Sequence, residues 1–366
     1  MKKIGLSCFE GFVCKADKCK DNCCIGWEID IDQVTLEKYK NYKGALSDRF
    51  EKDICYEDTP HFILGEGERC PFLNKDGLCD IILDSGEDML CEICDKHPRF
   101  YEWLPGMTFE GYGIGCEKAA EMLISSDKPI TFTETEISDA DEENQPDDMC
   151  ETVYDVLKAS VAILQNRKAH FVYRLMTLLA FGSSVQNAVE AEQYEMIPQI
   201  IAQYSDEDFV TSQYVNYMRF ETDSCGELHH NLIDIYRSLE NLDEKWHKHL
   251  ALLYDEFDIV VDCESIEDRS YIWENMAIYF LFRHLPASYN DDDFLSRIKF
   301  VIMSFLTNGL LMRVYLEDRL VPMATMYSKE IEYSDENISI LLDATYTEEC
   351  LSTQNLMSML IRLRDI

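Results

Sequence analysis

Basic residues are scarce in this chain. Lysine and arginine together number 33 against 70 aspartates and glutamates in 366 residues, which gives a formal net charge of −37 at pH 7. Such a charge repels polyanions and attracts cationic surfaces, including those that carry many lysines. The composition therefore excludes nucleic acid as a partner. The same acidity is also typical of a well-solvated surface, so the charge alone does not select a function.

Long hydrophobic runs are missing as well. The chain has a basic start at Lys2 and Lys3, but glycines, Ser7 and Glu10 interrupt the segment 4–13, so no apolar leader core forms. No stretch approaches the roughly 18 apolar residues of a membrane span. We therefore expect a cytoplasmic protein with no membrane partner, in which thiols stay reduced.

Strand patterns are few and short, as at 29–31 and 259–261, and no repeat of fixed period occurs. Beyond residue 152, apolar residues recur three and four positions apart, for example at Val153, Val156, Leu157 and Val161. This spacing predicts one helix after another. The sequence thus predicts a mainly α fold, in which an irregular, cysteine-rich, metal- or cluster-binding N-terminal module precedes an all-helical C-terminal domain.

The clearest domain boundary is acidic. Nine acids and no Lys or Arg lie between Glu134 and Glu151, and Pro146 interrupts any helix there, which predicts an exposed linker. We expect a cysteine-rich metal or iron–sulfur module at 1–130, the acidic linker at 131–151 and a helical domain at 152–366. Two helices are expected within the first module, Gln33 to Tyr42 and Glu117 to Ser125.

Cysteine is abundant and unevenly placed. Eleven of the fifteen cysteines lie in the first 116 residues, and nine of these form one spaced series: Cys14, Cys19, Cys23, Cys24, Cys70, Cys79, Cys91, Cys94 and Cys116. Thiolates at short spacing are the usual ligands of zinc and of iron–sulfur clusters. Buried structural thiols or disulfides are the alternative reading.

The spacing ranks the candidate ligands. Cys91-x2-Cys94 allows two thiolates to grip one metal from a single turn, so these two are the strongest candidates. Cys23 and Cys24 are adjacent and point in different directions, so that one is expected to be a ligand while the other packs or serves a second site. The full set of predicted metal ligands is Cys19, Cys23, Cys24, Cys70, Cys79, Cys91, Cys94 and Cys116.

Ligand type does not separate zinc from iron–sulfur, because both accept four thiolates. A zinc ribbon pairs two Cys-x2-Cys knuckles and this chain has one, which favours a [4Fe–4S] cluster over zinc. The Cys-x3-Cys-x2-Cys signature of radical enzymes is not met, since Gly26 stands where the third cysteine belongs. Radical chemistry is therefore not supported.

No nucleotide-binding pattern is present, because the glycines at 111–115 lack the spacing and the βαβ frame that such a site requires. The best candidates for a cofactor site near the cysteines are Trp27, Glu28, Asp30 and Asp32. A capped helix start beside a buried Trp explains the same residues. In the helical part, Glu274 and Asn275 could line a pocket.

The remaining chemical groups suggest little. His229, His230, His247 and His249 fall in polar, charged helical stretches and are expected at the surface. The scattered cysteines Cys150, Cys225, Cys263 and Cys350 are expected to be ordinary thiols. No catalytic nucleophile, and no base that could deprotonate a substrate, can be singled out.

Several motifs occur in a fixed order: Asp21-Asn22-Cys23-Cys24-x-Gly26-Trp27, Cys70-Pro71-Phe72-Leu73, Gly77-Leu78-Cys79, Cys91-x2-Cys94-x2-His97-Pro98-Arg99 and Gly115-Cys116-Glu117-Lys118. This series resembles the flagellin lysine-N-methylase family and a wider class of cysteine-rich proteins described as iron or zinc chelators. The likeness is dense over residues 9–120. In the helical part it is limited to Trp273-Glu274-Asn275-Met276-Ala277 and the residues up to Pro286.

The resemblance implies an enzyme, a protein-lysine N-methyltransferase that moves a methyl group from S-adenosylmethionine to surface lysines of flagellin or a similar lysine-bearing protein. Methyl transfer to nitrogen is polar chemistry and requires no electron, so we expect the cluster to have a structural role. The alternative hypothesis is a non-enzymatic protein that binds or sequesters iron or zinc. A weaker third hypothesis is an adaptor whose acidic surface docks a basic partner.

Overall fold

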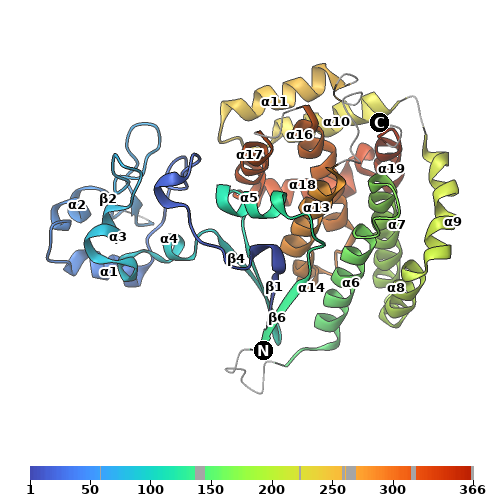
Figure 1. The fold of residues 1–366 in the computed structure, drawn as a ribbon, viewed down its shortest axis with the longest axis horizontal. Helices are drawn as coiled ribbons and strands as arrows, with labels where there is room; N and C mark the ends of the chain where they lie inside the picture. Colours follow the sequence, from blue (N-terminus) through green and yellow to red (C-terminus); the bar gives the residue numbers. More distant parts are fainter. Residues whose placement is uncertain are drawn as a thin grey trace. The chain divides into compact units, whose positions relative to one another are not determined.

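The structure is a computed structural model that describes residues 1–57, 59–136, 145–221, 224–257, 260, 269–314 and 319–363, with the side chains of 313 and 314 left aside. The chain divides into two compact units. The cysteine unit comprises Gly11–Phe100 and Tyr112–Ala119, and the helical unit comprises Met1–Glu10, Tyr101–Gly111 and Ala120–Ile366. Figure 1 labels their helices and strands.

The cysteine unit consists of short elements joined by turns. They are α1 (Gln33–Asn41), α2 (Ser47–Lys52), β2 (Ile54–Cys55), β3 (His61–Phe62), α3 (Asp80–Ser85) and α4 (Glu92–Lys96). The predicted helix at 33–42 is confirmed, and Asp32 caps it by accepting a hydrogen bond from the Thr35 backbone N–H at 2.9 Å.

Aromatic rings form the centre of the cysteine unit. Phe50 stacks on Tyr39 with ring centroids 4.2 Å apart and lies 5.2 Å from Phe72, which in turn contacts Phe62. Cys70 and Cys91 are buried in the same core, so the thiols of this unit pack directly against its rings. Loops by themselves bury too little apolar surface to be stable, so this small aromatic core stabilises the loops of the unit.

The helical unit begins with a small sheet that the sequence did not predict. Its strand order is β4-β5-β1-β6, with β1 at Lys2–Leu6, β4 at Arg99–Leu104, β5 at Met107–Tyr112 and β6 at Phe132–Glu136. β1 runs parallel to β5 and antiparallel to β6. Part of the predicted acidic linker is therefore a strand, and residues 137–144 of that linker lie outside the described residues. The predicted domain limits stay a prediction, and the two compact units divide the chain differently.

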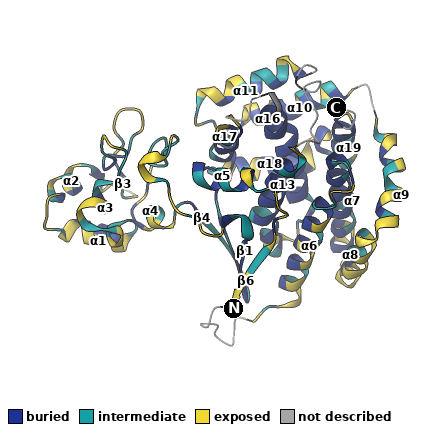
Figure 2. Cartoon of the chain, viewed as in Figure 1, coloured by how far each residue is buried: buried dark blue, intermediate teal, exposed yellow. Residues whose placement is uncertain are grey.

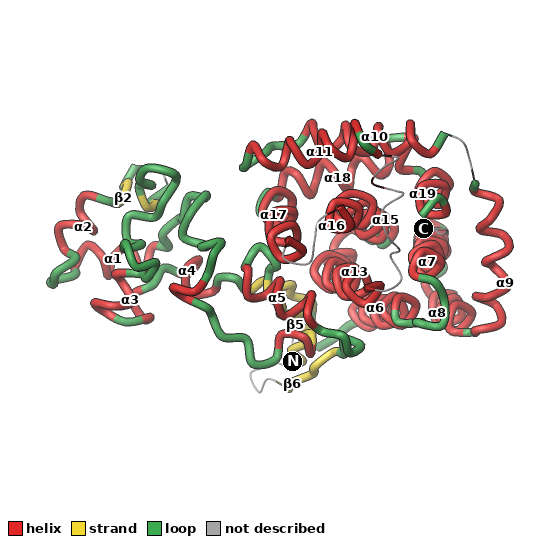
Figure 3. Tube along the Cα trace, turned by 45° about the horizontal axis from the view of Figure 1, so that its top comes forward, coloured by secondary structure: helices red, strands yellow, loops and turns green. Residues whose placement is uncertain are grey.

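The rest of the helical unit is α-helical, as predicted. Its helices are α5 (Glu117–Ser125), α6 (Asp148–Leu164), α7 (Phe171–Glu190), α8 (Ile197–Ser205), α9 (Glu207–Tyr217), α10 (Cys225–Ser238), α11 (Glu244–Asp255), α13 (Ser270–His284), α14 (Ser288–Asp291), α15 (Leu295–Ser304), α16 (Leu310–Val314), α17 (Leu320–Glu332), α18 (Asp335–Thr347) and α19 (Thr353–Ile361). α5 bears out the prediction at 117–125. In Figure 3, α13, α15 and α16 are seen nearly end-on, with α6, α7, α11 and α17 around them.

Burial identifies the central helices of this unit. α7 and α13 are mostly dark blue in Figure 2, whereas α9 carries much exposed surface. The predicted apolar face of α6 is confirmed, because Val153, Val156, Leu157 and Val161 are all buried. The buried residues of α6, α7 and α13 thus lie in the interior of the unit.

One expectation from the sequence is wrong. Leu295–Met312, which runs through α15 and α16, is long and apolar enough to cross a membrane by length and composition. It is the one stretch in the described part of the chain that meets these length and hydropathy criteria, and 94% of it is buried inside the structure. Arg297 and Lys299 interrupt the apolar residues of this stretch, so a search of the sequence for an uninterrupted apolar run does not find it. Its burial is that of a core helix.

Candidate functional site

The cysteines of the series are free thiols that gather in two sets. The inner thiol set consists of Cys24, Cys70, Cys79, Cys91 and Cys94, which lie in or against the aromatic core. The five sulfurs interact electrostatically with one another. Cysteines up to 70 residues apart in the sequence thus come together in one group, in which Cys70 and Cys91 are buried and the other three are half-buried.

Backbone pairing explains how the inner thiol set forms. The Cys70 N–H donates to the Cys24 carbonyl at 2.9 Å, which joins the first cysteine cluster to the second. Asn74 accepts hydrogen bonds from the backbone N–H groups of Asp76 and Leu78, and this turn returns the chain to Cys79. The sequence Asn74 to Cys79 is therefore a thiol-positioning turn.

Cys91 and Cys94 lie on one helical turn, as their spacing predicted. Cys91 precedes the first residue of α4, and its carbonyl accepts the Asp95 N–H at 2.9 Å. The two thiols share a hydrogen bond, which lowers the pKa of Cys91 and raises the pKa of Cys94. A thiolate beside a thiol donor is the arrangement from which a soft metal displaces the remaining proton.

The outer thiol set consists of Cys14, Cys19, Cys23 and Cys116. Cys116 interacts electrostatically with Cys14 and Cys23, and Cys19 interacts with Cys116. Cys23 and Cys24 fall in different sets, and the prediction that one is a ligand while the other packs or serves a second site stays a prediction. The thiols of this adjacent pair also share a hydrogen bond, which lowers the pKa of Cys23 and raises that of Cys24.

His97 and Trp27 surround Cys23. The His97 imidazole hydrogen-bonds the Cys23 thiol, and the Trp27 indole Nε1–H donates to the Cys23 carbonyl at 2.6 Å. The two rings lie 5.8 Å apart. Trp27 therefore has a structural partner beside the thiols, and it is half-buried rather than buried as the alternative reading expected.

Glu117 organises the loop that carries Cys19, a role that the sequence did not indicate. One carboxylate oxygen accepts the backbone N–H groups of Lys20 and Asp21 at 2.6 and 2.9 Å, and the other pairs with Lys15 at 2.5 Å. Although burial raises the pKa of Glu117, the hydrogen bond from Lys15 and those from the backbone lower it to about 2. The sequence feature from which this role could have been inferred is the position of Glu117 directly after Cys116.

The four predicted cofactor residues have three different surroundings: Trp27 lies beside Cys23, Asp32 caps backbone N–H groups, and Glu28 and Asp30 lie together. Asp32 is used twice as a backbone cap, for Thr35 in α1 and for the Glu92 N–H in α4 at 2.9 Å. Glu28 and Asp30 lie with His61, and one potential ligand atom from each residue is within 4.8 Å of the other two. Among the described residues, this is the one group of three potential metal ligands at such short distances. The predicted cofactor role of Trp27, Glu28, Asp30 and Asp32 stays a prediction.

The predicted pocket residues Glu274 and Asn275 have structural partners. Glu274 is fully buried and accepts hydrogen bonds from Arg174 at 2.7 Å and from Arg167 at 2.8 Å. The Asn275 amide donates to the carbonyls of Leu123 and Ser126. Both side chains hold α13 against neighbouring segments of the helical unit.

The histidines that were expected at the surface differ in their burial. His247 is exposed, as predicted, but the surface expectation is wrong for His229, which is fully buried with its Nε2 3.1 Å from the Leu306 carbonyl. Cys150, Cys225 and Cys350 are buried thiols as expected, and Cys263 lies outside the described residues.

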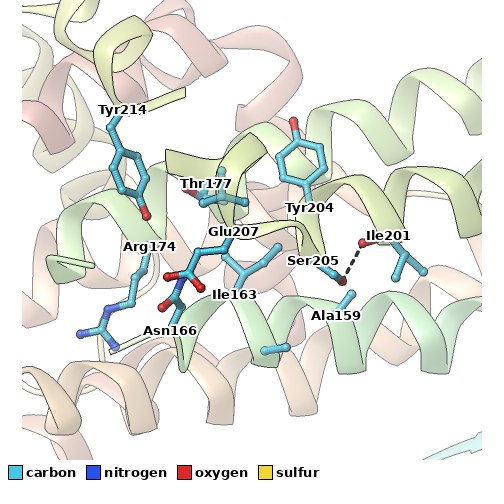
Figure 4. A pocket seen from close by; sticks show the side chains of 12 residues that line it. Ala159, Ile163, Asn166, Arg174, Thr177, Ile201, Tyr204, Ser205, Glu207 and Tyr214 are labelled. Atoms are coloured by element: carbon cyan, nitrogen blue, oxygen red, sulfur yellow. Dashed lines mark hydrogen bonds between the residues drawn. The ribbon is translucent and has the colours of Figure 1, made fainter. Parts of the chain in front are cut away.

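A cavity of about 260 Å³ lies in the helical unit between α6, α7, α8 and α9 (Figure 4). It is lined by Ala159, Ala162, Ile163, Asn166, Arg174, Thr177, Ile201, Tyr204, Ser205, Glu207, Val210 and Tyr214. In this view Arg174, Asn166 and Glu207 gather toward one end, and Tyr204 and Ser205 lie toward the other. A cavity with an apolar wall and a few converging polar groups is the usual form of a small-molecule site.

Comparison with known proteins finds curated relatives of this chain. The curated lysine-N-methylase of Salmonella typhimurium is 24% identical over 135 residues, which are 34% of this chain and 33% of that protein. The flagellar biosynthetic protein FliU of Salmonella muenchen is 24% identical over 132 residues, 34% of this chain and 77% of that protein. The chain thus spans about a third of the length of the curated lysine-N-methylases it matches. No solved structure matches.

The family match falls on the helical unit and not on the cysteines that carried the resemblance in the sequence. The FliB lysine N-methylase C-terminal domain matches residues 158–360, more than half of the chain and nearly all of the region from α6 to α19. The resemblance inferred from the cysteine motifs is confirmed by this independent segment. The chain therefore belongs to the FliB lysine N-methylase C-terminal domain family.

Proposed function

We propose that this protein transfers a methyl group from S-adenosylmethionine to the ε-nitrogen of lysines on flagellin or a similar lysine-bearing protein. The observation that carries the proposal is the family match over the helical unit, which also contains the cavity. The names of the relatives, lysine-N-methylase and flagellar biosynthetic protein, support the same activity and substrate class.

The reaction makes definite demands on the protein. The lysine nitrogen must lose a proton before its lone pair forms the new C–N bond, while the S–CH₃ bond breaks and its electron pair remains on sulfur as S-adenosylhomocysteine. The nitrogen and the methyl carbon must be aligned at roughly 3 Å. The net charge of −37 favours the approach of a lysine-rich surface, but it also favours the protonated amine. A local apolar or aromatic environment is therefore needed to release the proton.

We assign the inner thiol set to a [4Fe–4S] cluster with a structural role. The fit rests on the donor set, because a cluster needs four thiolates and five thiols gather here, two within the aromatic core and three packed against it. The sequence has one Cys-x2-Cys knuckle, at Cys91 and Cys94, where a zinc ribbon pairs two, and this favours the cluster over zinc.

The cluster, when bound, supplies cross-links between loops that have few apolar contacts of their own. The chain's residues position it: the Asn74 turn presents Cys79, and α4 presents Cys91 and Cys94. Reduced thiols are needed for such ligation, so the proposal includes a cytoplasmic location.

The experiment is a label-transfer assay with purified, cluster-loaded protein, methyl-labelled S-adenosylmethionine and purified flagellin. Label should appear on flagellin lysines and should depend on both proteins. If the protein keeps its metal but leaves flagellin unlabelled and does not bind the methyl donor, the non-enzymatic metal-binding alternative takes its place.

A further inference from the structure

We propose that the cavity between α6, α7, α8 and α9 binds the α-amino-acid end of S-adenosylmethionine, with Arg174 directed to its carboxylate and Glu207 to its ammonium group. This assignment rests on the proposed function and adds to it the location of the methyl donor. It moves the donor site away from Trp27, Glu28, Asp30 and Asp32 to the helical unit.

Arg174 gives one end of the cavity a positive character. It is 1% exposed, and its Nη1 donates to Glu274 and to the Leu164 carbonyl, each at 2.7 Å. Arg167 pairs with the same Glu274 carboxylate at 2.8 Å. Two guanidinium groups therefore share one carboxylate, and the three side chains carry a net positive charge. A ligand carboxylate at this end balances that charge in surroundings of low dielectric constant.

Glu207 supplies the opposite charge on the same cavity. It is the first residue of α9, and it pairs with Lys168 at 2.9 Å. Both partners are largely exposed, with 76% and 62% of the Lys168 and Glu207 side chains accessible, so the pair contributes little and exchanges readily. The ammonium group of a ligand can therefore replace Lys168.

The combination selects between the two substrates of the proposed reaction. A zwitterion presents a carboxylate and an ammonium group together, which suits Arg174 and Glu207. A protein lysine presents a cation alone, and Arg174 would repel it. The wall formed by Ala159, Ala162 and Ile163 is apolar and suits the methylene groups of a methionine side chain.

The size of the cavity agrees with the amino-acid part of the donor. At about 260 Å³ it lies just below the range of roughly 300–1,000 Å³ that is typical of sites for whole drug-sized ligands. The small side chain of Ala159, half-buried on α6, keeps this space open. A larger residue there would occupy the cavity without entering the core.

The test is calorimetry on the full-length, cluster-loaded protein with two probes. S-adenosylhomocysteine contains the amino-acid end, and methylthioadenosine lacks it. The wild type should bind S-adenosylhomocysteine at least about tenfold more tightly, a difference that corresponds to two charge-assisted contacts. Glu207→Gln should remove most of this preference while leaving methylthioadenosine binding unchanged. Ala159→Leu should weaken S-adenosylhomocysteine at least tenfold, whereas Ala251→Leu on α11, the matched control, should have no effect.

The outcomes test the cavity assignment separately from the proposed methyl-transfer function. If both cavity variants bind S-adenosylhomocysteine as tightly as the wild type does, or if the wild type does not distinguish the two probes, the cavity assignment is wrong even where flagellin is methylated. If the variants lose binding but the wild type does not label flagellin, the cavity assignment is retained and the proposed function is lost.

Discussion

At the scale of single residues, buried ionisable groups hold the helical unit together. Glu274 joins Arg167 and Arg174, and Glu332 joins Arg283 at 3.2 Å and His284 at 3.0 Å. Each carboxylate lies fully inside the protein, where an unpaired charge is costly. These groups are consequently more important for stability than the many surface acids that dominate the composition.

Glu274→Gln is expected to lower the free energy of unfolding by about 3–5 kcal/mol, because Arg174 would remain buried without its carboxylate. Chemical denaturation followed by circular dichroism measures this. The matched control is Glu207→Gln, whose exposed pair with Lys168 should change stability by less than about 1 kcal/mol. Equal effects of the two substitutions would show that the buried network is not the stabilising element.

His229 makes stability depend on pH. Burial lowers its pKa from 6.5 to about 4, so the unfolded chain binds a proton that the folded chain does not. Stability from this residue is fully present above pH 6.5 and is lost as the pH falls toward 4, by about 3 kcal/mol in total. Denaturation midpoints at pH 7, 6 and 5 should decline less steeply in His229→Gln than in the wild type. His247→Gln, at an exposed position, should keep the wild-type slope.

At the scale of elements, the sequence predicted what local patterns encode. The apolar faces of α6 and α15 recur at helical spacing, and Asp32 precedes α1 as a cap, so these elements were predictable. The sheet was not, because β1, β5 and β6 are short and come from distant parts of the chain. His229 was misjudged from its polar neighbours, although Leu232 and Ile233 three and four positions on share its buried face.

The two candidate sites, the thiols and the cavity, also differ in how far they could be predicted from local sequence patterns. Cys91 and Cys94 were recognisable from spacing alone, since one turn of α4 brings them together. The cavity was not, because its charged residues, Arg174 and Glu207, belong to different helices and neither follows a motif. Sites assembled by tertiary packing leave no local pattern.

Helix α4 provides the element-level prediction for the cluster. Cys91→Ser and Cys94→Ser should each remove most of the iron and acid-labile sulfide from anaerobically purified protein, and should also loosen the fold of the cysteine unit. Cys350→Ser, a buried thiol of the helical unit, should keep both. Iron and sulfide analysis decides the point: zinc in place of iron in the wild type would reject the cluster, and unchanged metal in both α4 variants would reject these ligands.

At the scale of the whole molecule, the two units have different relations to the proposed reaction. The helical unit carries the family match and the cavity, and the cysteine unit carries the predicted metal ligands. The acidity of the chain as a whole favours a lysine-bearing protein as substrate. Methylation should therefore weaken as ionic strength rises, because attraction between exposed charges is screened over about 10 Å at 0.1 M salt.

The most direct test of methyl transfer is the intact mass of flagellin produced together with this protein. The proposed function predicts increments of about 14 Da, one for each methyl group added, at lysine side chains. Flagellin produced alone, in the same cells, should show none. Unmodified flagellin in the presence of soluble, cluster-loaded protein would contradict the proposal.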